Sequence, residues 1–197
     1  MKIMLTKGEI ARKSIHLSSI FVIFSDTFLN HSLTIFALIF LILIYLFSEL
    51  LRNKFKTNSI SRITNYCSYN FEKKSFVYSP LIFALSILIL LAFFPKGQAY
   101  VGIIVLTLGD GISGLIGKLF GRNKIFYNKK KSYEGSFSMF IVSFFSLMFF
   151  TKNIQLSFII SLVGTTVESF SNEAIDNFTV PLSVVLTTIL ISNFYLL

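Results

Sequence analysis

A lone carboxyl residue, Asp110, stands among glycines where an apolar stretch of this 197-residue chain ends. The glycines around and after it are Gly109, Gly111, Gly114, Gly117 and Gly121. A Mg²⁺ ion that accompanies a nucleotide takes one or two protein carboxylates together with phosphate oxygens. Asp110 is therefore a candidate metal ligand, and Gly109 and Gly111 are candidates for close backbone approach by a phosphate. The alternatives are an Asp that merely ends a helix at the membrane interface and, for the later glycines, close packing of two helices.

A second polar cluster precedes the next apolar stretch. It consists of Lys131, Ser132, Glu134, Gly135 and Ser136. The free N–H groups and the positive dipole end of a helix that starts here would bind an anion. Lys131 would contact a β- or γ-phosphate as a point charge. Ser132 or Ser136 would cap the helix, and Glu134 would bind a metal ion or the lysine. The alternative is an ordinary capped helix start whose lysines only orient the chain in the membrane.

Polar residues also flank the first two apolar stretches. Arg12 and His16 are four residues apart, so they share one face of a helix, and Lys13 lies between them in sequence. A histidine here is either a polar anchor at the membrane interface or a base that accepts a substrate proton. Glu49 and Arg52, near the end of the second stretch, would pair within the helix or brace the site.

Three further polar residues lie near the C-terminus. Glu168 falls within an apolar stretch just before a polar loop, where its carboxylate would be desolvated, so it is a candidate supporting residue. Asp176 and Asn177 open the last apolar stretch. Asp176 is a candidate second metal carboxylate or a helix N-cap, and it can fill both roles.

The composition places these residues in a membrane. The chain is 54% hydrophobic and 14% charged, with 24 phenylalanines and a mean hydropathy of +0.75. Such a chain has too little polar surface to cover a water-soluble globule. We expect an all-α, polytopic membrane helix bundle that forms one domain over residues 1–197. The seven expected spans are 15–29, 33–51, 76–94, 99–116, 136–150, 154–170 and 178–197, with a polar loop over 117–135.

The net charge of +9 indicates orientation rather than nucleic-acid binding. Of the 18 lysines and arginines, 16 fall in three segments that lie on one side if the chain has seven spans. Short cytoplasmic loops are enriched in lysine and arginine, so the N-terminus is predicted to be cytoplasmic. All the candidate residues then lie at the cytoplasmic ends of spans, where they would converge on one site.

Five motifs in order resemble one family. They are GDGISGLIGKLFGR at 109–122, KSYEGS at 131–136, Arg12-Lys13 with His16, Glu49 with Arg52, and DNFTVP at 176–181. Together they resemble the polyprenol, dolichol and phytol kinases, a family that contains CTP-dependent membrane lipid kinases. The middle motif is more distantly similar to the CDP-diacylglycerol synthases.

The resemblance implies a kinase that transfers the γ-phosphate of CTP, with Mg²⁺, to a polyprenol, dolichol, phytol-type alcohol or diacylglycerol. The implied catalytic residues are Asp110, Lys131, Asp176, His16, Arg12 and Lys13. The implied metal ligands are Asp110, Asp176 and Glu134, and the supporting residues are Glu49, Arg52, Glu168 and Asn177. The implied nucleotide-binding residues are Gly109, Gly111, Gly114, Gly117, Gly121, Arg122, Lys131, Ser132, Glu134, Gly135 and Ser136. The expected partners are the nucleotide, the lipid alcohol and the bilayer; an oligomer is compatible with the sequence.

Two other functions compete with this one. A CDP-lipid synthase would carry a basic pair and a His-Gly-Gly stretch, and the segment 167–177 has neither. A transporter would carry acids at mid-depth in an inverted repeat, whereas these acids lie on one side and no repeat is evident.

Overall fold

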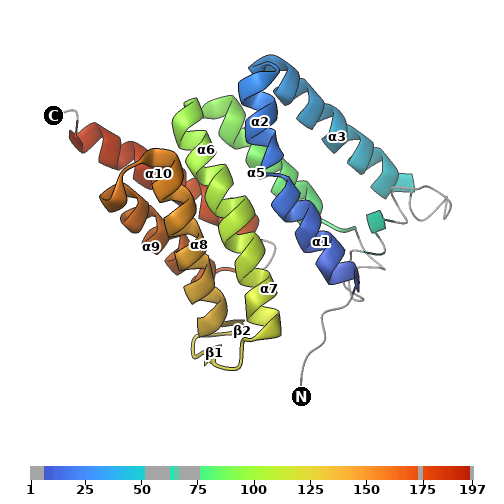
Figure 1. Ribbon diagram of the computed structural model, residues 1–197. Coiled ribbons are helices and arrows are strands. Elements are labelled where there is room, and N and C mark those ends of the chain that lie inside the picture. Colours follow the sequence, from blue (N-terminus) through green and yellow to red (C-terminus); the bar gives the residue numbers. More distant parts are fainter. Residues whose placement is uncertain (1–6, 52–62, 65, 67–75, 173–174, 196–197) are drawn as a thin grey trace.

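The computed structural model describes residues 7–51, 63–64, 66, 76–172 and 175–195. Within them the protein is a helical bundle with one short β-hairpin (Figure 1). The helices are α1 (Lys7–Ser18), α2 (Phe21–Phe28), α3 (His31–Leu51), α5 (Ser79–Phe93), α6 (Lys96–Ile104), α7 (Gly111–Leu119), α8 (Tyr133–Thr151), α9 (Ile154–Phe170) and α10 (Asp176–Tyr195). A π-helical turn, η1 (Val105–Asp110), joins α6 to α7, and β1 (Lys124–Ile125) pairs antiparallel with β2 (Asn128–Ser132). The helical fold is confirmed, with the hairpin as an addition.

Three helical stretches of the described chain are long and apolar enough to cross a membrane. They are His31–Leu51, Lys96–Leu119 and Tyr133–Thr151. Shorter apolar helices cover Ser79–Phe93, Ile154–Phe170 and Asp176–Ser192. Large apolar side chains such as Phe36, Phe137 and Phe149 are exposed on these helices, as expected of surfaces that face lipid. The helices support a membrane protein, while the number of spans and the orientation stay predictions.

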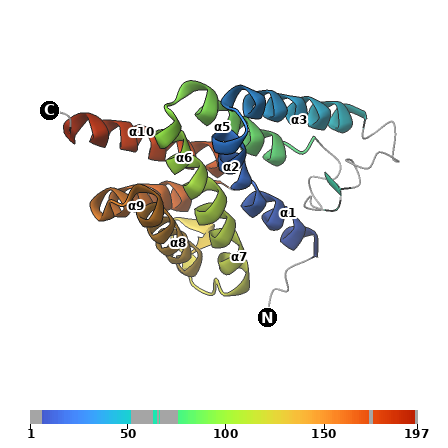
Figure 2. The same cartoon turned by 45° about the horizontal axis from the view of Figure 1, so that its top comes forward.

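The central element is the continuous stretch α6–η1–α7. It runs through the middle of the bundle, with α8 and α9 on one side and α1, α2 and α3 on the other (Figures 1 and 2). Its residues Ala99, Ile103, Val105 and Leu106 are fully buried. Two apolar clusters meet on it, one shared with α3 and α5 and the other shared with α8, α9 and α10. This helix therefore holds Asp110 at a fixed depth inside the protein.

Two expected element boundaries were wrong. The first apolar stretch is divided, because α1 ends at Ser18 and α2 begins at Phe21. The expected loop 117–135 instead contains the last turn of α7 and the hairpin. The Asn128 side-chain amide donates to the carbonyl oxygens of Ser169 (3.0 Å) and Ser171 (3.1 Å). These bonds fix the hairpin to the C-terminal end of α9, and so they fix the position of Lys131 in β2.

A buried acid ties together the opposite end of the bundle. Asp26 in α2 is 2% exposed and accepts hydrogen bonds from Tyr100 (2.5 Å) and His31 (2.7 Å), and Lys96 lies 3.4 Å away. These partners lie in α6 and at the start of α3. This cluster joins the α2–α3 turn to α6.

Replacing Asp26 with asparagine should destabilise the protein without affecting its chemistry. The change weakens the bonds of two buried or half-buried donors, which typically costs about 1–3 kcal/mol of unfolding free energy. Thermal unfolding in detergent should show a melting temperature several degrees lower than that of Ser32→Ala, an exposed neighbour. Equal melting temperatures would show that the cluster does not hold this end together.

Candidate active site

One cavity of about 720 Å³ lies where α1, α3 and α5 face α7, β2 and the starts of α8 and α10. Its lining changes in character from one part to the other. The charged and amide side chains are Glu9, Arg12, Lys13, His16, Asp110, Lys118, Lys124, Lys130, Lys131, Glu168, Asp176 and Asn177. Apolar side chains from α2, α3 and α5, including Val22, Leu38, Ile42, Phe83 and Ile87, line the rest. The cavity therefore joins a charged compartment to a hydrocarbon-lined one.

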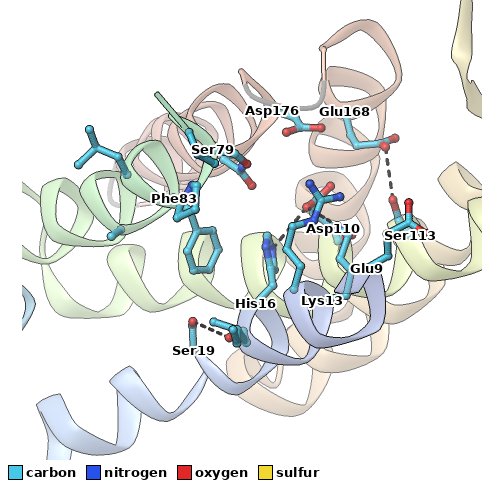
Figure 3. Close-up of a pocket in the computed structure, with 18 of the residues that line it drawn as sticks. Glu9, Lys13, His16, Ser19, Ser79, Phe83, Asp110, Ser113, Glu168 and Asp176 are labelled. Atoms are coloured by element: carbon cyan, nitrogen blue, oxygen red, sulfur yellow. Dashed lines mark hydrogen bonds and ion pairs between the residues drawn. The ribbon is translucent and has the colours of Figure 1, made fainter. Parts of the chain in front are cut away.

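Asp110 anchors the α1 side of the charged compartment (Figure 3). Its Oδ2 lies 3.4 Å from both Lys13 Nζ and His16 Nε2, and Lys13 also donates to the Asp110 carbonyl at 3.3 Å. His16 Nε2 donates to the carbonyl oxygen of Leu106 at 2.8 Å. Leu106 belongs to the π-helical turn η1, which departs from the regular α-helical hydrogen-bond pattern. Such turns are frequent at functional sites. Because a carbonyl only accepts, the proton of the neutral ring is on Nε2, which leaves Nδ1 as its acceptor.

Lys131 lies at the centre of the other side of the charged compartment, where β2, α9 and α10 meet. Its Nζ donates to Glu168 Oε1 (2.5 Å) and to Asp176 Oδ2 (2.8 Å). Glu168 also accepts from Ser113 Oγ (3.3 Å) and Ser136 Oγ (3.1 Å), so it is buried but fully engaged. Burial disfavours the charged lysine, but the carboxylates of Asp176 and Glu168 outweigh it and raise the pKa of Lys131. Lys131 therefore stays protonated across the pH range of enzyme assays.

The structure brings all six of the expected catalytic residues to one cavity. Asp110, Lys131 and Asp176 line the same cavity although they come from η1, β2 and α10. Arg12, Lys13 and His16 reach it from α1, and Glu168 and Asn177 from α9 and α10. Residues from distant parts of the sequence therefore meet in one compartment, as the motif positions predicted.

Some of the glycines pack helices together and others line the cavity, and these two groups differ from the expected ones. A Cβ atom at Gly109 would meet Ser143 Oγ, and one at Gly111 would lie 2.8 Å from Leu17 Cδ2, so these two glycines serve helix packing. Those that line the cavity are Gly114, Gly117, Gly121 and Gly135. A Cβ at Gly135 would lie 3.2 Å from the Gly117 Cα, so α7 and α8 touch through glycine backbone beside the cavity. The glycines beside the cavity are therefore the later ones, and two of them are closely packed as well: a Cβ at Gly114 would meet the Lys13 side chain, and one at Gly121 would meet the Gly117 carbonyl oxygen.

Three other expected residues, Glu134, Arg122 and Glu49, lie apart from the cavity centre. Glu134 Oε1 accepts from the backbone N–H groups of Arg122 (3.2 Å) and Asn123 (3.0 Å), so it braces the segment after α7. Neither Glu134 nor the exposed Arg122 lines the cavity. Glu49 is buried and accepts from the Val77 N–H at 2.9 Å, which makes it a brace between α3 and the start of α5. Arg52 lies outside the described residues.

Ser132 and Ser136, the two serines of the KSYEGS motif, make different contacts. Ser132 caps α8 by accepting from the Gly135 N–H at 3.2 Å, and it also lines the cavity. Ser136 does not cap the helix but donates to Glu168.

Sequence reasoning missed two features of the site. Ser113 lies within the glycine motif but has no distinctive spacing, and in the structure it reaches Glu168. Glu9 shares a helix face with Lys13 by spacing, but its carboxylate pairs with Lys118 of α7 at 2.6 Å. Contacts between helices far apart in sequence leave no trace in local spacing.

The acids suit a metal ion that arrives with a nucleotide. The described residues contain no group of three or more His, Cys, Asp or Glu side chains that could hold a metal ion. However, Asp176 Oδ1 is buried and has no hydrogen-bond partner within the described chain. Magnesium in nucleotide sites needs only one or two protein carboxylates because phosphates and water supply the other ligands. Asp176 and Asp110 therefore fit as its protein ligands.

Relatives with known names resemble part of this chain. It is 35% identical over 130 residues to "Phytol kinase 1, chloroplastic" of Arabidopsis thaliana, which covers 56% of this chain and 42% of that protein. It is 37% identical over 118 residues to "Phytol kinase" of Synechocystis sp., covering 53% and 51%. The chain thus spans about half the length of the curated relatives it matches. No family profile and no solved structure matches it. Over more than half of its own length the chain is therefore similar to two proteins named phytol kinase.

Proposed function

We propose that the chain is a membrane lipid-alcohol kinase that transfers the γ-phosphate of CTP to the hydroxyl of an isoprenoid alcohol. The observation that carries this proposal is the two-part cavity, in which a compartment of acids and cations opens onto one lined by α2, α3 and α5. A lipid alcohol needs both, because its chain requires an apolar surface and its hydroxyl requires polar partners. The named relatives agree with this reading.

The transferred phosphate lies next to Lys131 in this proposal. Catalysis of phosphoryl transfer consists largely of positioning and of neutralising charge on the phosphate oxygens. Glu168 and Asp176 fix the ammonium group of Lys131 from two sides, so it is placed before the substrate arrives. Gly114, Gly117 and Gly121 border the same space. Arg12 and Lys13 supply further positive charge from α1.

Magnesium, when bound with the nucleotide, neutralises negative charge on the phosphates. Asp176 and Asp110 are the carboxylates that would hold it. Glu134 was a third candidate ligand; its bonds to Arg122 and Asn123 favour a bracing role instead.

His16 is the candidate base for the substrate hydroxyl. Its Nε2 is engaged with Leu106 and lies near Asp110, so Nδ1 is the atom available to accept a proton. The ring also packs on Phe83, with centroids 4.2 Å apart. His16 thus lies at the boundary between the charged and the hydrocarbon-lined compartments, where the hydroxyl of a bound alcohol would lie. The charge pattern predicts that this boundary lies near the cytoplasmic side.

A panel of alcohols tests the proposal. Purified protein in detergent is incubated with Mg²⁺ and with each of the four nucleoside triphosphates, labelled at the γ-phosphate. We expect labelled lipid phosphate from phytol or a polyprenol, with CTP as the preferred donor and CDP as the second product. If the protein instead releases pyrophosphate when a phosphorylated lipid is offered as the acceptor, the reaction is cytidylyl transfer. No labelled lipid with any alcohol would overturn the kinase assignment.

A further inference from the structure

The first helices of the bundle form a V around the hydrocarbon-lined compartment. α2 packs on α3 at the apex, whereas α1 packs mainly on α7 and η1. From that apex α1 and α3 diverge in both views, and α5 lies behind the space between them (Figures 1 and 2). The cavity occupies this V, because residues of α1, α3 and α5 line it together.

Among the residues that the structure describes, the V is closed at its apex and open along its side. The lining residues Val22, Leu38 and Ile87 belong to or pack on the apolar core at the apex, and Leu38 and Ile87 are buried. Toward the wider part, Ile15 of α1 and Leu41 of α3 also line the cavity but are 52% and 60% exposed. Their exposed surfaces are apolar, and Leu41 belongs to α3, which is long and apolar enough to cross a membrane. On the α3 side the opening is therefore suited to hydrocarbon rather than water.

We infer that the space between α1 and α3 is a lateral portal for the hydrocarbon tail of the lipid alcohol. This inference rests on the proposed function and adds the route and the binding mode of the acceptor. A lipid chain gains little by leaving one apolar surface for another, so it can slide from the bilayer between Ile15 and Leu41 at low cost. The hydroxyl then reaches His16 and Asp110, which are polar groups that the bilayer core does not offer.

A portal of this kind would admit tails of different length. Because the cleft is open at its side, the end of a long chain stays in the bilayer, and only the part next to the hydroxyl is enclosed. Phe83 lies against His16 at the inner end of this path and limits how far the apolar chain enters.

Two leucines of α3 offer a matched test. Leu41 lines the cavity and Leu43 does not, yet both are exposed, by 60% and 57%, on the same helix. A twenty-carbon isoprenoid alcohol with a diazirine midway along its chain, in the part that passes through the portal, is photoactivated with the purified full chain, and labelled peptides are identified by mass spectrometry. We expect labelling of the segments that carry Ile15 and Leu41, with competition by the unlabelled alcohol. Leu41→Trp should lower this labelling by about tenfold, since it narrows the cleft, and Leu43→Trp should leave it unchanged.

Kinetics provide the second readout. Leu41→Trp should lower kcat/KM for the twenty-carbon alcohol by about tenfold and leave that for a five-carbon prenyl alcohol within about twofold. Labelling that is spread evenly over α3, α8 and α9, or equal effects of the two tryptophan variants, would overturn the portal. If portal labelling is observed but no alcohol is phosphorylated, the kinase proposal fails and the portal stands as a lipid-binding site. If an alcohol is phosphorylated but the portal segments are not labelled, the portal fails and the kinase proposal stands.

Discussion

Replacing Lys131 with methionine should lower kcat by about 10³-fold, which corresponds to about 4 kcal/mol of lost transition-state stabilisation. Methionine keeps much of the side-chain length but removes the charge that Glu168 and Asp176 hold in place. The developing charge on the transferring phosphate then loses a cation that was positioned in advance. Turnover is measured with the labelled triphosphate and the best alcohol of the panel.

The matched control is Lys129→Met in the same strand. Lys129 is exposed and does not line the cavity, so its loss should leave turnover within about twofold if surface charge matters little. Lys131→Met also leaves two carboxylates facing each other in a buried place, a change that can cost about 3–5 kcal/mol of stability. The double variant Lys131→Met/Glu168→Gln removes this repulsion. It should recover the melting temperature of the parent protein but not its turnover.

These variants separate a catalytic role from a structural one. If the double variant regains both folding and activity, Lys131 only neutralises its two acids. If Lys129→Met loses as much activity as Lys131→Met, the strand contributes general positive charge and no specific phosphate contact.

The position of the site was predictable because charge and hydropathy act over the whole chain. An apolar chain must place its acids and cations at span ends or in a cavity, and the positive charges of this chain fall in few segments. That argument alone placed Asp110, Lys131 and Asp176 at the same end of the bundle. The structure adds that they line one cavity.

The roles of the glycines were not predictable from spacing. Side-chain directions in a regular helix follow a period of about 3.6 residues, and a π-helical turn interrupts this period. The turn Val105–Asp110 ends directly before Gly111. Gly111 then faces Leu17 of α1, whereas Gly114 and Gly117 line the cavity. The local sequence contains no pattern that predicts a π-helical turn.

The partners of Lys131 were hidden for a different reason. Glu134 is close to it in sequence, whereas Glu168 and Asp176 become its neighbours only because the hairpin is bonded to the end of α9. The two-residue strand β1 contains no alternating pattern that would identify a hairpin. Glu168 was expected only as a desolvated supporting residue, and the structure adds that it pairs with Lys131.

Asp110→Asn should lower kcat by at least about 10²-fold and raise the Mg²⁺ concentration needed for half-maximal turnover. Asparagine keeps the shape of the side chain, so the packing of the central helix is preserved. The change removes the negative charge that faces Lys13 and His16 and that would hold the metal ion. The two readouts are turnover at saturating Mg²⁺ and the Mg²⁺ titration itself.

Asp26→Asn is the control for removal of a buried acid. Asp26 is also buried in a helix and paired with a histidine and a lysine, but it lies at the opposite end of the bundle. Assayed below its melting temperature, this variant should keep both the turnover and the Mg²⁺ requirement of the parent protein.

The comparison with Lys13→Met decides what Asp110 does. If Asp110 serves only to hold Lys13, then Asp110→Asn and Lys13→Met should cause the same loss, the double variant should lose no more, and the Mg²⁺ requirement should not change. If Asp110 is a metal ligand, the Mg²⁺ requirement should rise in Asp110→Asn and stay unchanged in Lys13→Met. Because both residues line the same cavity and touch each other, only the metal titration distinguishes the two roles.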